Sequence, residues 1–177
     1  MEELKQRIIL ETTKLFADHG IKAIRMDDIS SHMGISKRTL YEVFGDKEAL
    51  IIDCIIYIKD GAEQKSREIM AKAGNVIEEF ILLFEYWETN VEGSNNIMLD
   101  IKRFYPKIYD EVMDRHVNQS FDKLKSELQR GVDDGYLLER VDLDLAISVF
   151  GYSMYGISKH DAVLLRNVSD KEAFKYV

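Results

Sequence analysis

Residues 27–50 read DDISSHMGISKRTLYEVFGDKEAL. In this stretch, two short segments with helical apolar spacing flank a turn at 34–36. Gly34 can adopt the left-handed conformation that ends a helix, and Ser36 can cap the helix that follows. The second segment begins with polar side chains: Lys37, Arg38, Thr39 and Tyr41. A short helix with such side chains at its N-terminal end fits the major groove of DNA, so the pattern predicts a helix-turn-helix.

Helical spacing of apolar residues continues on both sides of this motif. It predicts helices over 3–19, 27–33 and 37–44, a long helix after Asp46, and later helices after Asn75, over 98–103, from Pro106 to Gly131 and after Asp142. A polar break is expected at 92–96, and the helix that begins near 169 looks cut short. We therefore predict an all-α protein with a three-helix head over 1–45 and a helical-bundle body over 46–177. The ninth and last helix, which begins near 169, is expected to be truncated.

Composition narrows the class of protein. An apolar fraction of 46% in 177 residues is enough for a full core and argues against a disordered chain. The single cysteine, Cys54, excludes a disulfide within the chain, suits a reducing cytosol and is expected to fill the core. Because neither a secretory leader nor a run of about 18 apolar residues is found, we expect a cytoplasmic protein without a membrane span.

The net charge of −8 is unevenly distributed. Residues 1–50 contain 8 Lys+Arg and 9 Asp+Glu, whereas the rest of the chain contains 16 and 23. Basic residues gather around the predicted head: Lys22, Arg25, Lys37, Arg38 and Lys47. Overall acidity does not exclude a local basic patch, and a modest patch predicts moderate DNA affinity with steep salt dependence.

The sequence offers no basis for an enzyme or a cofactor. His32 and His116 have no Cys/His cluster with ligand spacing around them, so no metal site is expected. There is also no glycine-flanked serine and no glycine-rich phosphate loop. The acidic residues are spread over helix surfaces rather than paired in an apolar setting.

The residues of this motif and its flanks resemble the TetR family of bacterial transcriptional regulators. The resemblance covers residues 4–50 and rests on Leu15-Phe16 before His19-Gly20, the approach from Ala23 to Met26, Ile29, Gly34-Ile35-Ser36, Thr39-Leu40-Tyr41, Phe44, Lys47-Glu48 and Leu50. It implies a homodimer that binds a palindromic DNA operator, typically as a repressor, and that a small molecule in the body releases from DNA.

The resemblance also implies roles for individual residues. Ser36, Tyr41 and Lys47 match positions that bind phosphates, and Lys37, Arg38 and Thr39 match the part of the recognition helix that meets base edges. One position departs from the family, because Arg25 stands where a Thr or Ser usually caps the second helix. A guanidinium can bind phosphate but cannot accept a hydrogen bond. We therefore expect this helix to begin one or two residues late, capped by Asp27.

Residues of the body are candidates for an effector pocket and a dimer interface. The pocket candidates are Phe80, Phe84, Trp87, Met98, Phe104, Met113, His116 and Tyr152, and the dimer candidates are Phe150, Gly151, Met154 and Tyr155. For each aromatic or methionine residue alone, and for His116, ordinary core packing is the simpler interpretation. Together they supply enough apolar volume for a cavity that holds a mostly apolar ligand with one or two polar groups.

Two alternatives stay open from the sequence. The first is a helix-turn-helix regulator whose body answers to a protein partner instead of a small molecule. The second is a helical enzyme or interaction protein that carries a fortuitous helix-turn-helix. Binding of a DNA operator would exclude the second.

Overall fold

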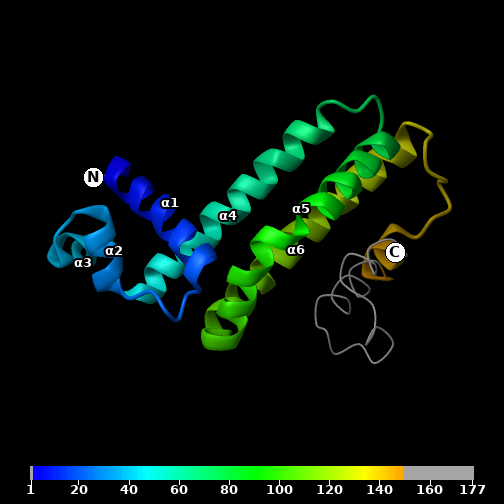
Figure 1. Cartoon of the computed structure of the whole chain (residues 1–177). Helices are drawn as coiled ribbons and strands as arrows, with labels where there is room; N and C mark the ends of the chain where they lie inside the picture. The colour runs from blue at the N-terminus through cyan, green and yellow to red at the C-terminus, as the bar shows by residue number, and fades with distance from the viewer. Residues whose placement is uncertain (1, 150–177) are drawn as a thin grey trace. The chain divides into compact units, whose positions relative to one another are not determined.

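The computed structural model describes residues 2–149, with the side chains of 87–96 and 113–118 left out of the description. These residues form α1 (Glu2–His19), α2 (Met26–Met33), α3 (Lys37–Phe44), α4 (Lys47–Met70), α5 (Val76–Phe104) and α6 (Pro106–Asp133), followed by helical residues 143–149 (Figure 1). No strand occurs in this part of the chain. The predicted all-α class is confirmed.

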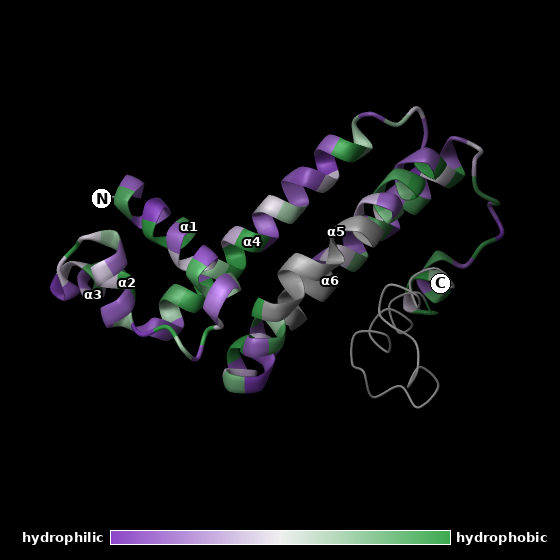
Figure 2. Ribbon diagram, in the orientation of Figure 1, coloured by the Kyte–Doolittle hydropathy of each residue, from purple (hydrophilic) through white to green (hydrophobic). Residues whose placement is uncertain are grey.

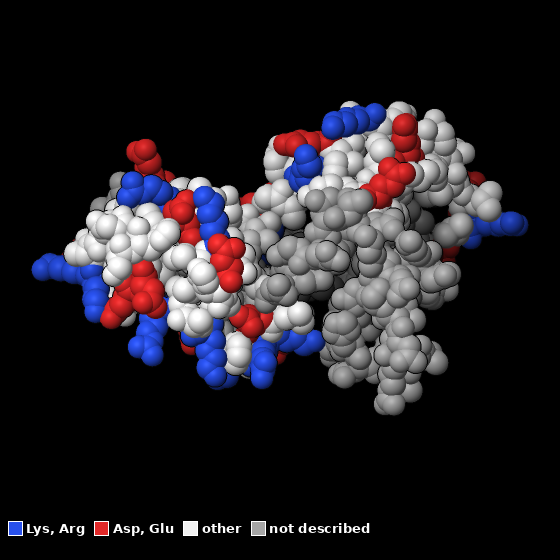
Figure 3. Space-filling view, viewed as in Figure 1, with Lys and Arg blue, Asp and Glu red and all other residues white. Residues whose placement is uncertain are grey.

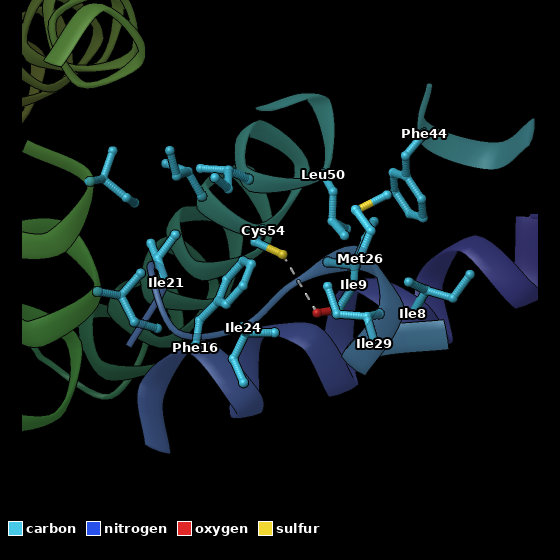
Figure 4. Close-up of a cluster of buried hydrophobic side chains, with 14 of the residues drawn as sticks. Ile8, Ile9, Phe16, Ile21, Ile24, Met26, Ile29, Phe44, Leu50 and Cys54 are labelled. Carbon is cyan, nitrogen blue, oxygen red and sulfur yellow. Dashed lines mark hydrogen bonds between the residues drawn. The ribbon is translucent and has the colours of Figure 1, made fainter. Parts of the chain in front are cut away.

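The chain divides into two compact units. The first combines Met1–Arg67 with Glu92–Asp114, and the second begins with Glu68–Val91 and continues from Arg115. The predicted division at residue 45 remains a prediction, but the hydrophobic core of the first unit extends past it. That core draws on α1, α2, α3, α4, the end of α5 and the start of α6, through Ile8, Ile9, Phe16, Ile29, Leu40, Phe44, Leu50, Ile51, Cys54, Ile55, Ile97, Ile101 and Ile108 (Figure 4).

Helix α4 changes character along its length. Its first three turns are rich in Leu and Ile, and Leu50, Ile51 and Ile55 are fully buried in the core of the first unit. Further along, the sequence turns polar, as Figure 2 shows. The helix begins after Asp46, as predicted. The Asp46 carboxylate accepts a hydrogen bond from the backbone N–H of Ala49 at 2.8 Å, which is the usual geometry of an N-cap.

The expected break at 92–96 is wrong. Helix α5 continues from Val76 to Phe104, so the predicted short helix over 98–103 is its last part. A glycine in a helix interior costs only about 1 kcal/mol. Beyond the polar stretch, Ile97 and Ile101 are buried in the core of the first unit and stabilise the helix there. The break before α6 occurs where predicted, at Pro106.

In the second unit, α5 and α6 are held together by close side-chain packing and by an ion pair. A Cβ on Gly131 would lie 2.8 Å from Val76 and 2.9 Å from Leu137, so any larger residue there would have to displace these side chains. Next to it, Arg130 pairs with the buried carboxylate of Glu79 and with Glu127. These two carboxylates raise the pKa of the Arg130 guanidinium.

The side chain of Cys54 is enclosed in the core, where its Sγ lies 3.8 Å from the carbonyl oxygen of Ile9 (Figure 4). Burial raises the pKa of this thiol to about 12, so the reactive thiolate is scarce at neutral pH. We expect a maleimide at pH 7.5 to label Cys54 very slowly in the folded protein and rapidly in 6 M urea, as followed by mass spectrometry. Equal labelling rates in the two conditions would contradict this burial.

Candidate nucleic-acid interface

The turn between α2 and α3 has the geometry that the sequence predicts. Gly34 is left-handed, with φ 65° and ψ 31°, and its N–H donates to the carbonyl of Ser31. Ser36 is extended, and its Oγ accepts the backbone N–H of Thr39 at 3.0 Å. Gly34 therefore ends one helix and Ser36 caps the next within three residues, as in a helix-turn-helix.

The two faces of α3 are cleanly separated. Leu40 and Phe44 are buried in the core, which confirms their predicted inward orientation. Tyr41 is 46% exposed, so it is not a core aromatic. The exposed residues of the helix are Lys37, Arg38, Tyr41 and Glu42, while Thr39 is partly buried. The first turn of α3 thus presents its cations outward, as binding in a groove requires.

Both of these cations have a carboxylate partner. Lys37 Nζ contacts Asp27 Oδ2 across the turn at 2.5 Å, and Arg38 Nε donates to Glu42 Oε1 at 2.8 Å. Figure 3 shows basic and acidic side chains mixed on the surface over α2 and α3. The surface of the predicted interface is therefore not a purely positive patch, and a phosphate that bound there would have to compete with these carboxylates.

Helix α2 begins earlier than expected. It starts at Met26 with Arg25 at the N-cap position, so the late start and the cap by Asp27 are wrong. The Arg25 side chain makes no capping hydrogen bond, as expected for a guanidinium. The helix start is stabilised from the other side, because Asp28 Oδ2 accepts the backbone N–H of Arg25 at 2.8 Å. This arrangement leaves the exposed guanidinium of Arg25 available to a phosphate.

Lys47 has a structural role that the sequence did not reveal. Its Nζ donates to the carbonyl oxygens of Ile21 at 2.6 Å and of Ile24, and lies 5.7 Å from the ring centre of Phe16. Desolvation of this ammonium lowers the pKa of Lys47. Because an ammonium has three donors, one is left for a phosphate, and the predicted phosphate contact of Lys47 remains a prediction.

Asp100 on α5 also contacts the loop between α1 and α2, and the sequence analysis did not predict this contact. Its Oδ2 accepts the backbone N–H of Ile21 at 2.9 Å, and a Cβ on Gly20 would lie 2.9 Å from this oxygen. Gly20 has φ 80°, which also favours glycine. A signal was present: Asp100 follows Ile97 by three residues and precedes Ile101, so a carboxylate lies on an apolar helix face and requires a partner.

Replacing Asp100 by alanine should therefore destabilise the protein. The N–H of Ile21 would lose its acceptor, which costs about 1–3 kcal/mol when the group is buried. Asp100→Asn keeps an oxygen at the same place and should lose much less. Urea unfolding followed by circular dichroism measures both changes, and equal stability of Asp100→Ala and the wild type would refute the role of this contact.

The structure places the predicted pocket residues only in part. Phe80 and Phe84 lie in the second unit, whereas Met98 and Phe104 lie in the first. Met98 packs against the core of the first unit. The Nζ of Lys22 lies 4.8 Å from the ring centre of Phe104. Trp87, Met113 and His116 belong to α5 and α6, but their side chains are outside the description. Tyr152 and the dimer candidates Phe150, Gly151, Met154 and Tyr155 lie outside the described residues. The pocket and the dimer interface remain predictions.

The described residues contain neither a metal-binding cluster nor a membrane-spanning helix. No group of three or more His, Cys, Asp or Glu side chains there could hold a metal ion. None of the helices described is both long and apolar enough to span a bilayer.

Comparison with known proteins agrees with this geometry. The sequence model of the family described as "Bacterial regulatory proteins, tetR family" matches residues 8–54, which include α2, α3 and the turn between them. Over these residues the chain is similar to the TetR family. The curated relatives that match the chain are named as transcriptional regulators.

Two relatives of this chain occur in Bacillus subtilis (strain 168). The HTH-type transcriptional regulator YerO is 44% identical over 59 residues, which are 33% of this chain and 20% of YerO. The HTH-type transcriptional regulator YezE is 23% identical over 78 residues, which are 44% of this chain and 40% of YezE. The alignments thus cover less than half of either relative.

Solved structures of transcriptional regulators match this chain in fold over most of its length. A transcriptional regulator from Saccharomonospora viridis, solved in complex with choline, matches with a TM-score of 0.75 and 18% identity over 99% of this chain and 94% of that one. A TetR-family regulator from Pectobacterium atrosepticum matches with a TM-score of 0.72 and 18% identity, over 99% and 92% of the two chains. At such identities the likeness concerns the fold alone.

Proposed function

We propose that this protein is a TetR-family repressor that binds a palindromic operator as a homodimer, and that a small, mostly apolar ligand releases it from DNA. The observation that carries the DNA-binding part is the exposed first turn of α3, where Lys37 and Arg38 stand outward beside the cap at Ser36. Arg25 and Tyr41 flank this turn as exposed phosphate donors. A function of this kind belongs in the bacterial cytoplasm.

In the proposed mechanism, the spacing between two heads controls DNA affinity. Two recognition helices must lie about 34–36 Å apart to enter successive major grooves on one side of the duplex. A ligand that binds the wrongly spaced dimer more tightly must weaken operator binding by the same factor. The complex of the Saccharomonospora viridis regulator with choline supports a small-molecule ligand in a protein of this fold.

Selection of bound fragments from a random duplex library tests the DNA-binding part. We expect the purified protein to enrich an inverted repeat whose half-sites are one helical turn, or a multiple of it, apart. The affinity for the selected duplex should fall steeply with salt, by a slope of about 0.9 in log–log form for each phosphate contact. Failure to enrich any sequence, even at low salt, would overturn the proposal.

Reciprocal titration tests the ligand part. Quaternary amines, fatty acids and aromatic compounds would be screened for those that raise the melting temperature of the protein. A compound that lowers duplex affinity by some factor must itself bind the protein–duplex complex more weakly by that factor. If every compound that binds leaves duplex affinity unchanged, release by a small molecule is wrong and control by a protein partner becomes the better hypothesis.

A further inference from the structure

The ion pair between Arg38 and Glu42 on α3 is not accounted for by the stability of the helix. Arg38 is at position i and Glu42 at i+4, which is the less favourable order for such a pair. Glu42 also lies in the second half of an eight-residue helix, where a negative charge opposes the helix dipole. A carboxylate on this surface repels the phosphates of DNA as well. The pair therefore needs another explanation.

The geometry of the contact supplies one. Glu42 Oε1 binds Nε of Arg38 at 2.8 Å, which occupies the inner edge of the guanidinium. Glu42 leaves the N–H groups on Nη1 and Nη2 unused, and one from each nitrogen forms a parallel pair on the outer edge. The Arg38 side chain is 88% exposed. Two parallel N–H donors on a planar group match O6 and N7 of a guanine in the major groove. Without a partner, so long a side chain would sample many rotamers.

We propose that Glu42 is a positioning residue for sequence recognition: it fixes the guanidinium of Arg38 so that its outer edge reads a guanine. This inference rests on the proposed DNA-binding function. The role requires the hydrogen-bond acceptor of Glu42 and not its charge. The charge alone opposes binding to any duplex, whatever its sequence.

The neighbouring pair of Lys37 and Asp27 provides a matched control. It also joins an exposed cation of α3 to an exposed carboxylate. Its cation, however, is a rotating ammonium without a planar fork, so a partner gives it no defined reading edge. Asp27 has its own reason to be present, because it lies in the first turn of α2, where the dipole favours a negative charge.

The experiment measures base preference with the full-length protein and the duplex that the wild type selects. Four duplexes are compared that differ only in the base pair at one position. This is the position at which Arg38→Ala changes the base preference of the protein. For the wild type we expect a guanine preference of roughly 5- to 150-fold at this position. Binding of an unrelated duplex is measured in parallel, and thermal unfolding confirms that each variant is folded.

The variants separate the hydrogen bond from the charge. Glu42→Ala should reduce the guanine preference at least about threefold while it strengthens binding to the unrelated duplex. Glu42→Gln keeps an acceptor oxygen, so it should retain the preference and show the same gain on the unrelated duplex. Asp27→Asn should strengthen binding to all duplexes alike and leave the preference unchanged.

Each outcome decides between the hypotheses. If Glu42→Ala keeps the guanine preference, or if Glu42→Gln loses it as well, the positioning role is wrong while the DNA-binding function stands. The same holds if no position in the selected duplex depends on Arg38. If the wild type selects no duplex at all, the proposed function fails and the positioning role fails with it.

Discussion

Replacing Arg38 and Tyr41 together by alanine is expected to lower the affinity for the selected duplex by about 100-fold or more. A bidentate contact between an arginine and a guanine supplies about 1–3 kcal/mol of discrimination. A hydrogen bond from the Tyr41 hydroxyl to a charged phosphate oxygen supplies about 1.5–3 kcal/mol. Fluorescence anisotropy titration of a labelled duplex measures the loss, and the salt dependence should become less steep at the same time.

The double variant should remain folded, because both side chains are exposed and neither contributes to the core. Arg67→Ala is a suitable control. Arg67 is an exposed arginine of α4 that also pairs with a glutamate, Glu63, at a spacing of four residues, but it lies far from α3 in the sequence. If the double variant bound the duplex as tightly as Arg67→Ala, α3 would not be the recognition helix.

The second large effect concerns stability and compares two neighbours of the same type on α4. Ile55 is fully buried in the core of the first unit, whereas Ile56 is 43% exposed. Ile55→Ala removes buried apolar atoms and leaves a cavity, which costs about 2–5 kcal/mol. Ile56→Ala should change stability by less than about 1 kcal/mol, since the site is open and alanine favours the helix. Urea unfolding of the two variants measures the difference.

The comparison is informative because both variants make the same chemical change one residue apart. Differences in helix propensity and in the unfolded chain largely cancel between them. If the two variants unfolded at the same urea concentration, the orientation of α4 in the core would be wrong. The set of core residues assigned to this helix would then be wrong as well.

The helix-turn-helix could be predicted from sequence because its signals are local. Gly34, the cap at Ser36 and the spacing of Leu40 and Phe44 act within one or two turns, and each has the predicted conformation or burial. The prediction for 92–96 was wrong because a polar stretch suggests a loop. The helix is stabilised beyond that stretch by the burial of Ile97 and Ile101. The spacing of apolar residues in the sequence does not show this packing. The start of α2 was misplaced for a related reason, since Asp28 compensates for the missing cap.

The charged contacts of the interface were predictable to different degrees. Arg38 and Glu42 are four residues apart on one helix, so their pairing follows from helix geometry. The contacts of Lys47 and Asp100 with Ile21 join residues 26 and 79 positions apart. Such pairings depend on how α4 and α5 pack on the loop after α1. The exposed side chains of the site could thus be named from sequence, but the residues that stabilise its frame could not.

The two contacts that hold the loop after α1 limit how this protein can be recombined with its relatives. A chimera that joins residues 1–45 to a foreign body leaves Lys47 and Asp100 behind. Two carbonyl oxygens, of Ile21 and Ile24, and one amide would then be stripped of their partners. Exchange of DNA specificity by transplantation therefore requires a recipient that has a lysine and a carboxylate or amide in the equivalent places.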